Sequence, residues 1–513
     1  MRPATAPSPE TIRQNRGELS PGLSFALLLG VIVGGTVLRF LYLTRKSFWL
    51  DEGVSVTLSR LDFANLLHIL WRREANMAFY YALLRIWLHF GSGDYFVRAL
   101  SALISVAAVP VIYLLGKRLF GSIAGLFAAA LFSVHAWQVR YAQEARSYSL
   151  YMLLTALSCL LFLAAVERPT RRRWTGYVAF SVLAIYSHFF SVLVVVAQWT
   201  AFHFLQRDER MQAEFRRSLK IIGVLFLPLA VFIVSRGAGP ISWITRPGLG
   251  NLHQFLLDLS GHGGDLLLLA YVGCCAVALA GGGWRRGRNL PFESWRYLFL
   301  LSWLLAPLAI TLLFSLFRPV FLPRYLLTCV APLVLLAAAG LARLRSRWLT
   351  AILLVIMLAL SLRGTLAYYR ADFDLGREDW RTATQYILNN SQAGDGILFH
   401  SAQARMPFEH YAGGQPARRQ VHVIFPANGG PGKLSYLDFL ANAKNASLAT
   451  VPGRYPRVWL VLAHNQLKDG APDATTAALE KFLERTYTLA DDRDFQGRIE
   501  ARLYVTKQPR DIP

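Results

Sequence analysis

Two neighbouring carboxylates, Asp51 and Glu52, follow the first long apolar run of the sequence by only a few residues. One carboxylate of such a pair can act as a general base, while the other tunes its charge or holds an acceptor or a metal ion. A structural interpretation competes with this one, because aspartate is a preferred N-cap residue and a helix is expected to start near Val54. Both interpretations stay open at this point.

A second group of reactive side chains lies between residues 140 and 148, where a short connection joins two apolar runs. Arg140 and Arg146 carry planar, forked guanidinium groups that can grip a phosphate. Glu144 could orient one of these arginines or bind an acceptor hydroxyl, and Tyr148 adds an aromatic ring. The alternative is an external ion pair in which these charged groups bind only one another and have no functional role. Exposed ion pairs of this kind contribute little to stability.

Three further segments contain candidate binding residues, namely Glu74, Asn76 and Tyr80 in the first, His188 in the second, and Arg324 and Tyr325 in the third. Histidine can transfer protons near neutral pH, and arginine can bind phosphate or diphosphate. Each segment also has a structural interpretation. Asn76 could cap a helix, and the aromatic rings, His188 and Arg324 could anchor helix ends at a membrane interface.

The composition places these residues in a membrane protein. Of the 513 residues, 54% are hydrophobic and only 17% are charged, whereas a soluble protein carries about 25% charged residues. Residues 1–370 contain 37 Lys and Arg against 15 Asp and Glu, while residues 371–513 contain 17 against 16. The excess of basic residues therefore accompanies the apolar part, which indicates contact with membrane lipids and argues against nucleic-acid binding.

About eleven apolar runs have the length of roughly 20 residues that a spanning helix needs. They lie near 22–43, 96–116, 121–138, 148–166, 174–188, 189–205, 219–235, 265–282, 297–316, 325–342 and 348–366. The four cysteines all fall inside apolar runs and are expected to be small buried hydrophobes. The predicted fold is mainly α, a polytopic bundle of about eleven transmembrane helices followed by an external α/β domain.

Three regions are expected along the chain. Residues 1–21 form a cytoplasmic tail, 22–366 form the multi-span domain, and 367–513 form a soluble domain of alternating apolar stretches and helix-like segments. Within the multi-span domain, the loop 44–95 contains two amphipathic segments that are expected to lie on the membrane surface. Its carboxylates make it the candidate catalytic loop.

The charges of the short loops predict the orientation. Lys and Arg are concentrated in one set of alternating loops, for example at 117–118, 168–173 and 343–347. Since such loops stay on the cytoplasmic side, the N-terminus is expected to be cytoplasmic and the C-terminal domain external. Every candidate site residue then maps to the external surface of a bacterial cell membrane. Carboxylates and arginines gathered there suit the processing of an amphiphilic phosphate.

An ordered set of motifs resembles the glycosyltransferase family 39 group, membrane enzymes related to protein O-mannosyltransferases and the lipid A aminoarabinose transferase. The motifs are Phe48–Glu52, Asn76–Tyr81 leading into 83–87, Phe96–Ser101, Gln143–Tyr148, Tyr186–Phe189 and Pro323–Leu326. The resemblance covers roughly residues 22–345, and the ordered set is more specific than any single motif. It implies the GT-C architecture and use of a dolichyl- or undecaprenyl-phosphate-linked sugar on the exoplasmic side.

The resemblance also implies roles for individual residues. Asp51 is expected to deprotonate the acceptor hydroxyl in an inverting transfer, and Glu52 and Glu144 to shape the acceptor and donor pocket. Arg146 and Arg324 are expected to neutralise the phosphate of the leaving group. Some relatives bind a metal through a glutamate and a histidine of external loops. Glu74, His253 and His262 are conceivable counterparts, so a divalent metal stays open, and no organic cofactor is expected.

The sequence therefore predicts a membrane glycosyltransferase, of the hexosyl or pentosyl type, that moves a sugar from a polyprenyl-phosphate carrier to a lipid, glycan or protein acceptor. One alternative is a transporter or flippase of lipid-linked sugars, which should carry polar groups or broken helices near mid-membrane. Transfer of another lipid-borne group, such as phosphoethanolamine, is a further alternative, and it usually calls for a metal-bound nucleophile. A non-catalytic scaffold would not require Asp51 and Glu52.

Overall fold

The computed structural model describes residues 19–72, 74–236, 244–281, 289–370, 377–426, 448–466 and 471–507. The chain forms two compact units. The helical unit contains Met1–Leu43, Leu70–Leu83 and Arg98–Arg370. The composite unit contains Thr44–Ile69, Leu84–Val97 and Ala371–Pro513, so it combines parts of the loop 44–95 with the C-terminal part of the chain.

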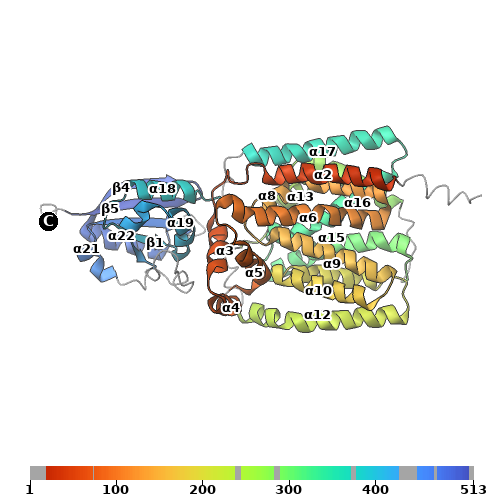
Figure 1. Ribbon diagram of the computed structural model, residues 1–513, viewed down its shortest axis with the longest axis horizontal. Coiled ribbons are helices and arrows are strands. Elements are labelled where there is room, and N and C mark those ends of the chain that lie inside the picture. The colour runs from red at the N-terminus through yellow and green to blue at the C-terminus, as the bar shows by residue number, and fades with distance from the viewer. Residues whose placement is uncertain are drawn as a thin grey trace, which may run out of the picture. The chain divides into compact units, whose positions relative to one another are not determined.

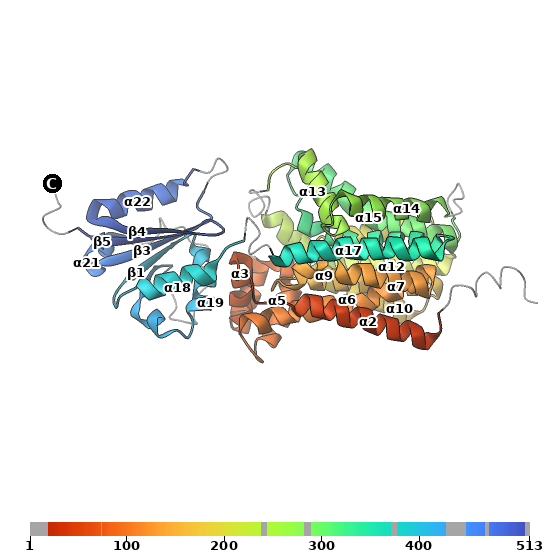
Figure 2. The same cartoon turned by 90° about the horizontal axis from the view of Figure 1, so that it is seen from above.

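Long helices make up the helical unit, and they run side by side in both views (Figures 1 and 2). In chain order they are α2 (Pro21–Phe40), α6 (Asp94–Phe120), α7 (Ser122–Val134), α8 (Ala136–Ala142), α9 (Tyr148–Glu167), α10 (Arg171–Ser187), α11 (Ser191–Phe202), α12 (Glu209–Arg236), α13 (Leu249–Ser260), α14 (Asp265–Ala280), α15 (Phe292–Phe317), η3 (Pro323–Cys329), α16 (Val330–Arg343) and α17 (Arg347–Arg370). The short η1 (Ala75–Met77) and the start of α5 (Ala78–Trp87) also belong to this unit.

Each of the eleven predicted apolar runs lies on one or more of these helices. Within the described ranges, seven helices are long and apolar enough to cross a membrane, or up to nine if two bent pairs each count as one span. The helices α10 and α11 are shorter, with 17 and 12 residues. The fold is thus mainly helical, as predicted, and the chain is an integral multi-pass membrane protein.

One of the two bent pairs consists of α7 and α8, which meet at an angle of 58°. Such a break removes helical partners from the last carbonyl groups, and in lipid these must be satisfied by other groups. Arg39 of α2, which is fully buried, donates from Nη1 to the carbonyl of Ser133 at 2.8 Å. Ser361 and Thr365 of α17 donate to the carbonyl of Val134 at 3.2 and 2.9 Å. The carbonyl groups of Ser133 and Val134 therefore have donors at the break that leads α8 into the 140–148 segment.

The composite unit contains a five-stranded sheet in the order β2-β1-β3-β5-β4. The strands β1 (Gly396–His400), β2 (His422–Phe425) and β3 (Arg457–Ala463) are parallel, and β5 (Ile499–Thr506) runs antiparallel to β3 and to β4 (Tyr487–Phe495). Helices α18 (Trp380–Asn390) and α19 (Arg405–Ala412) cover one face, and α22 (Ala474–Thr486) covers the other (Figure 2). The short η4 (Ala402–Ala404), η5 (Pro416–Gln420), η7 (Leu448–Thr450) and α21 (Val451–Arg454) connect them. The predicted α/β character of this part is confirmed.

Segments of the loop 44–95 belong to the same compact unit as this sheet. They form α3 (Leu50–Arg60), α4 (Phe63–Arg72) and the end of α5, and the latter two match the amphipathic segments predicted from sequence. Gly53 of α3 lies so close to α19 that a Cβ atom there would be 2.9 Å from the backbone nitrogen of Pro407. A glycine directly after the carboxylate pair therefore allows close contact between α3 and α19.

Candidate functional site

The carboxylate pair stands in the first turn of α3 in the composite unit. The helix begins at Leu50 and its N-cap is Trp49, so the structural interpretation of Asp51 as the N-cap of a helix starting near Val54 is wrong. Asp51 is half-buried, while Glu52 is fully buried. Negative charge in the first turn is favoured by the helix dipole. The backbone therefore presents both carboxylates at the beginning of a helix rather than in a flexible loop.

Side chains from the C-terminal part of the chain hold this turn. Arg377 Nη2 lies 3.4 Å from Glu52 Oε2, and both side chains are almost fully buried. The backbone N–H of Leu50 donates to Glu378 Oε2 at 2.9 Å. Glu378 is itself buried and also accepts a hydrogen bond from the indole of Trp380. The sequence residues that surround Asp51 and Glu52 thus come from a segment more than 300 positions away.

A histidine completes this group. His464 Nε2 lies 2.7 Å from Glu378 Oε1. This hydrogen bond raises the pKa of His464, and the negative charges of Glu378 and Asp51 add to that effect, while burial and Arg498 oppose it. His464 also has a φ of 53° in the left-handed region, a conformation that is uncommon outside glycine and often found at functional sites.

Asp94 connects a second loop segment to the same unit. Its carboxylate accepts hydrogen bonds from Arg381 Nη2 at 2.8 Å and from the hydroxyl of Tyr411 at 3.0 Å, and it lies 2.7 Å from His410 Nε2. The Tyr411 hydroxyl also accepts from the backbone N–H of Phe48 at 2.7 Å. The segments on both sides of α3 are therefore tied to α18 and α19.

The other candidate residues belong to the helical unit, where His188 forms the centre of an aromatic cluster. The fully buried imidazole is 4.9 Å from the ring of Tyr325, 5.0 Å from that of Tyr151 and 6.1 Å from that of Tyr148, measured between centroids. Arg146 and Arg324 lie close enough to interact with it electrostatically. Three predicted motifs, at 143–148, 186–189 and 323–326, therefore meet around one histidine.

Two residues of the segment 74–81 are bound to this cluster. Asn76 Oδ1 accepts from the backbone N–H of Phe189 at 3.0 Å. The hydroxyl of Tyr80 lies 3.0 Å from that of Ser101, which donates to the carbonyl of Arg146 at 3.3 Å. Asn76 and Tyr80 thus support the two segments that carry His188 and Arg146.

The predicted ion pair between Arg140 and Glu144 is long. The distance from Arg140 Nε to Glu144 Oε1 is 4.0 Å, which is beyond hydrogen-bonding range, although Glu144 is 3% exposed. The backbone N–H of Arg146 donates to the carbonyl of Glu144 at 2.8 Å, which closes a tight turn between them. The turn follows the end of α8, which carries Arg140, and it places Glu144 and Arg146 within six residues of Arg140 along the chain.

Three candidates remain for a metal site, namely Glu74, His253 and His262. Glu74 is half-buried and precedes η1, the turn that carries Asn76. His253 and His262 each lie next to an aspartate of their own hairpin, Asp265 at 2.8 Å and Asp258 at 2.6 Å. Among the described residues, no group of three His, Cys, Asp or Glu side chains is arranged to hold a metal ion. The structure therefore does not bring Glu74, His253 and His262 together.

Some residues of these groups could not be found from sequence. Tyr151 lies inside an apolar run where its polar atom gives no separate signal, and Glu378 and His464 lie in a domain without a recognisable motif. Ser101, in contrast, belongs to the predicted motif Phe96–Ser101. Arg377 and Glu378 do stand together in a polar stretch directly before an amphipathic helix. That clustering was the only sequence signal for them.

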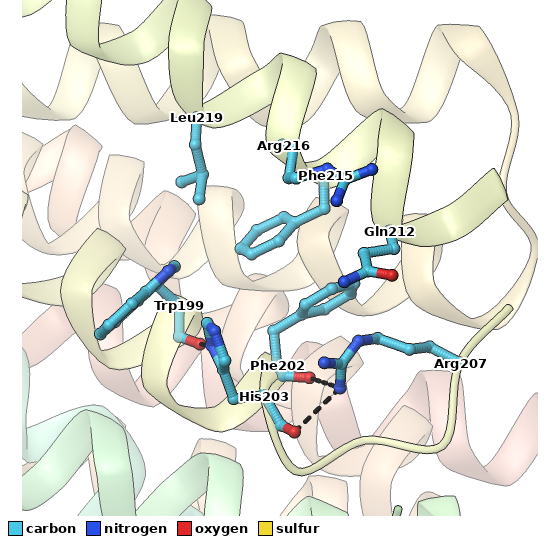
Figure 3. A pocket seen from close by; sticks show the side chains of 8 residues that line it. All are labelled: Trp199, Phe202, His203, Arg207, Gln212, Phe215, Arg216 and Leu219. Atoms are coloured by element: carbon cyan, nitrogen blue, oxygen red, sulfur yellow. Dashed lines mark hydrogen bonds between the residues drawn. The ribbon is translucent and has the colours of Figure 1, made fainter. Parts of the chain in front are cut away.

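A pocket of about 150 Å³ lies elsewhere in the helical unit, between the end of α11 and the start of α12 (Figure 3). Its lining residues are Trp199, Phe202, His203, Arg207, Gln212, Phe215, Arg216 and Leu219. Arg207 donates to the carbonyls of Phe202 and His203 at 2.7 and 2.9 Å, so its guanidinium caps the end of α11. None of the predicted site residues lines this pocket, which we assign to helix packing.

Comparison with known proteins identifies relatives of this chain. The family model of dolichyl-phosphate-mannose-protein mannosyltransferases matches residues 76–235, which confirms the predicted resemblance over that range. No curated protein matches the sequence. Among solved structures, ArnT from Cupriavidus metallidurans bound to undecaprenyl phosphate has a TM-score of 0.62 at 14% identity, over 94% of this chain and 98% of ArnT.

The oligosaccharyltransferase AglB from Archaeoglobus fulgidus, solved with an inhibitory peptide and a dolichol-phosphate, is also similar. Its TM-score is 0.51 at 13% identity, and the match covers 96% of this chain and 75% of AglB. At these identities the likeness concerns the fold. The predicted GT-C-like architecture, a helical membrane part with a small C-terminal sheet, is thereby confirmed.

Proposed function

We propose that this protein is a glycosyltransferase that moves a sugar from a polyprenyl-phosphate carrier to an acceptor on the non-cytoplasmic side of the membrane. The observation that carries the proposal is the cluster in which His188 contacts Tyr148 and Tyr325, with Arg146 and Arg324 near it in space, within a fold shared with a protein solved with undecaprenyl phosphate bound. Guanidinium groups beside aromatic rings suit a phosphate whose attached chain is apolar. The match to a family of dolichyl-phosphate-mannose transferases supports the same donor class.

The proposed reaction is a single displacement. Asp51 takes the proton of an acceptor hydroxyl, the acceptor oxygen forms a bond to the anomeric carbon, and the bond from that carbon to the phosphate oxygen breaks. The configuration inverts, and the polyprenyl phosphate leaves with one additional negative charge. Arg146 and Arg324 stabilise that charge, which develops only as the bond breaks.

The other candidate residues support these steps. Glu52, held beside Arg377, fixes the turn that carries Asp51. Glu144 shapes the donor or acceptor pocket, and Arg140, Tyr148 and Tyr325 extend the surface around the phosphate. The sugar is a hexose or a pentose, and the acceptor is a lipid, a glycan or a protein. In this proposal the N-terminus is cytoplasmic and the C-terminal domain is external, in line with the charges of the short loops.

The transporter alternative predicts broken helices that line a mid-membrane cavity. The described part of the helical unit has two bent helix pairs, and side chains bind carbonyl groups at both. Arg39, Ser361 and Thr365 do so between α7 and α8. Between α13 and α14, His135 Nε2 lies 3.1 Å from the carbonyl of Leu259. A break that is closed by packing does not favour transport. This observation leaves glycosyl transfer as the better-supported function.

The test is transfer of radiolabelled sugar from polyprenyl-phosphate donors in membranes that contain wild type or Asp51→Asn at matched levels. We expect wild type to transfer and the variant to bind donor without turnover, because asparagine cannot accept the proton. Equal transfer by the variant would reject Asp51 as the base. Movement of intact donor across vesicles that contain wild type, without transfer to any acceptor, would instead support the transporter alternative.

A further inference from the structure

We infer that Glu378 and Arg377 are positioning residues, which hold the turn of Asp51 and Glu52 in the orientation that sugar transfer requires. The inference rests on the proposed function, because it assigns these residues to the proposed base. All four residues belong to the composite unit, so their geometry is internal to it. The inference also gives the C-terminal part of the chain a role in the chemistry.

Glu378 acts in place of a local helix cap. The N-cap residue of α3, Trp49, makes no side-chain hydrogen bond to the first turn, although helix N-termini need acceptors for their free N–H groups. Glu378 Oε2 supplies one, at 2.9 Å from the backbone nitrogen of Leu50. A buried negative charge at this end is also favoured by the helix dipole. The first turn, which contains Asp51, is therefore fixed by a carboxylate from a distant part of the sequence.

Arg377 holds the side chain of the same turn. Its Nη2 lies 3.4 Å from Glu52 Oε2, and the two side chains are 4% and 0% exposed. Two consecutive residues thus contact one turn in two ways, Glu378 through the backbone and Arg377 through a side chain. Such a pair of contacts restricts both the translation of the turn and its rotation about the helix axis.

Glu378 is itself held rigidly by its neighbours. Trp380 donates to one of its oxygens, and His464 lies 2.7 Å from the other. The charges of Asp51 and Arg498 also act on His464. The carboxylate of Glu378 therefore has partners for both oxygens, which restricts its rotation and sets the direction of the cap.

The backbone under Glu378 is fixed as well. Gly497, in the turn between β4 and β5, has a φ of 82°, and a Cβ atom there would lie 2.3 Å from the Cα of Glu378. The backbone N–H of Asp379 donates to the carbonyl of Gln496 at 3.0 Å. The β4–β5 hairpin is thus in direct contact with residues 377–379. Support of this kind behind a contact residue is what a precisely placed catalytic group requires.

The expected effect is on turnover rather than on donor binding. A displacement of about 1 Å between reacting groups can lower a rate about 100-fold. Loss of Glu378 leaves Asp51 chemically intact but allows its turn to shift. We therefore expect kcat to fall while KM for the polyprenyl-phosphate donor stays near the wild-type value.

The experiment compares Glu378→Ala and Glu378→Gln with Asp395→Asn in the purified full-length protein. Asp395 is a matched control, since it is also a buried carboxylate, 1% exposed, that accepts from an indole, Trp459, and binds a basic side chain, Arg457. Asp395 precedes β1, whereas His464 follows the parallel strand β3, so the two groups lie at opposite ends of these neighbouring strands. Transfer rates are divided by the amount of folded protein, measured from thermal unfolding.

The inference predicts that Glu378→Ala lowers kcat about 100-fold, that Glu378→Gln, which keeps an acceptor oxygen, lowers it less, and that Asp395→Asn keeps wild-type kcat. If Glu378→Ala does not fold, Glu378→Gln decides by the same criterion. Wild-type kcat in the Glu378 variants, or an equal loss in Asp395→Asn, would overturn the inference. Since wild type and Asp51→Asn are assayed in parallel, absence of transfer by wild type would instead reject the proposed function.

Discussion

At the scale of single residues, the composite unit combines buried charges with partners from distant positions. Glu52 pairs with Arg377, and Glu378 receives hydrogen bonds from Leu50, Trp380 and His464. A charge removed from water is tolerated only if such partners replace its hydration. The buried carboxylates near the proposed base therefore have protein partners in place of water.

His464 makes one of these contacts dependent on pH. Its pKa is raised above the ordinary value of 6.5, first by the hydrogen bond to Glu378, so the folded protein binds this proton more tightly than the unfolded chain. The stabilisation is fully present below the unfolded pKa of about 6.5 and is lost as the pH rises through the raised value.

We therefore expect His464→Gln to lower the thermal midpoint of the full-length protein at pH 6 and to change it less at pH 9. The measurement is thermal unfolding between these values. His422→Gln serves as a control, because this exposed histidine lies on the edge strand β2, whereas His464 follows the central strand β3. A midpoint difference between wild type and His464→Gln that is independent of pH would contradict the account.

At the scale of elements, the break between α7 and α8 gives the 140–148 segment its direction. A straight helix would carry Arg140 further along the axis of α7, whereas the bend of 58° turns α8 aside. The bend persists because α2 and α17 supply donors to its free carbonyls. The position of the arginine and tyrosine cluster thus depends on two helices that carry none of the candidate residues.

The double variant Ser361→Ala and Thr365→Val removes the side-chain donors to the carbonyl of Val134 while keeping side-chain volume nearly constant. An unsatisfied carbonyl costs about 1–3 kcal/mol, so we expect a lower thermal midpoint in detergent. Thr36→Val is the matched control, since its hydroxyl binds only the carbonyl of Ile32 in its own helix among the contacts described. An equal change in both variants would show that the break needs no such donors.

At the scale of the whole molecule, most of the candidate catalytic loop belongs to the same compact unit as the C-terminal part of the chain. The segments Thr44–Ile69 and Leu84–Val97 form one compact unit with residues 371–513. Asp94 is central to this arrangement because it binds Arg381, His410 and Tyr411. Helix α3 therefore packs on the C-terminal part of the chain.

Replacement of Asp94 by alanine should loosen this packing. We expect Asp94→Ala to make residues 371–513 more sensitive to limited proteolysis in the full-length protein, because Arg381 and His410 lose their carboxylate. Asp62→Ala is a suitable control, as this exposed residue of the same loop binds only the nearby Asn65 among the described contacts. Unchanged cleavage of Asp94→Ala would indicate that the loop and the C-terminal part are held by other contacts.

Whether a feature could be predicted from sequence depends on how far apart the residues that form it lie along the chain. The apolar runs could be predicted because a membrane imposes a length and a hydrophobicity on each helix. Helix α13 lies outside the eleven predicted apolar runs, because His253, Gln254 and Asp258 interrupt its apolar pattern. Asp51 and Arg146 could be proposed from residue type and order. The contact between Glu378 and Leu50 could not, because it joins positions 328 residues apart.

The most direct test of the account is a single-turnover reaction with purified protein in lipid nanodiscs, in which released polyprenyl phosphate and sugar-modified acceptor are quantified together. We predict equal amounts of both products from wild type, and neither product from Asp51→Asn although it still binds the donor. Release of polyprenyl phosphate by Asp51→Asn at the wild-type rate, with sugar delivered to the acceptor, would contradict the assignment of Asp51 as the base.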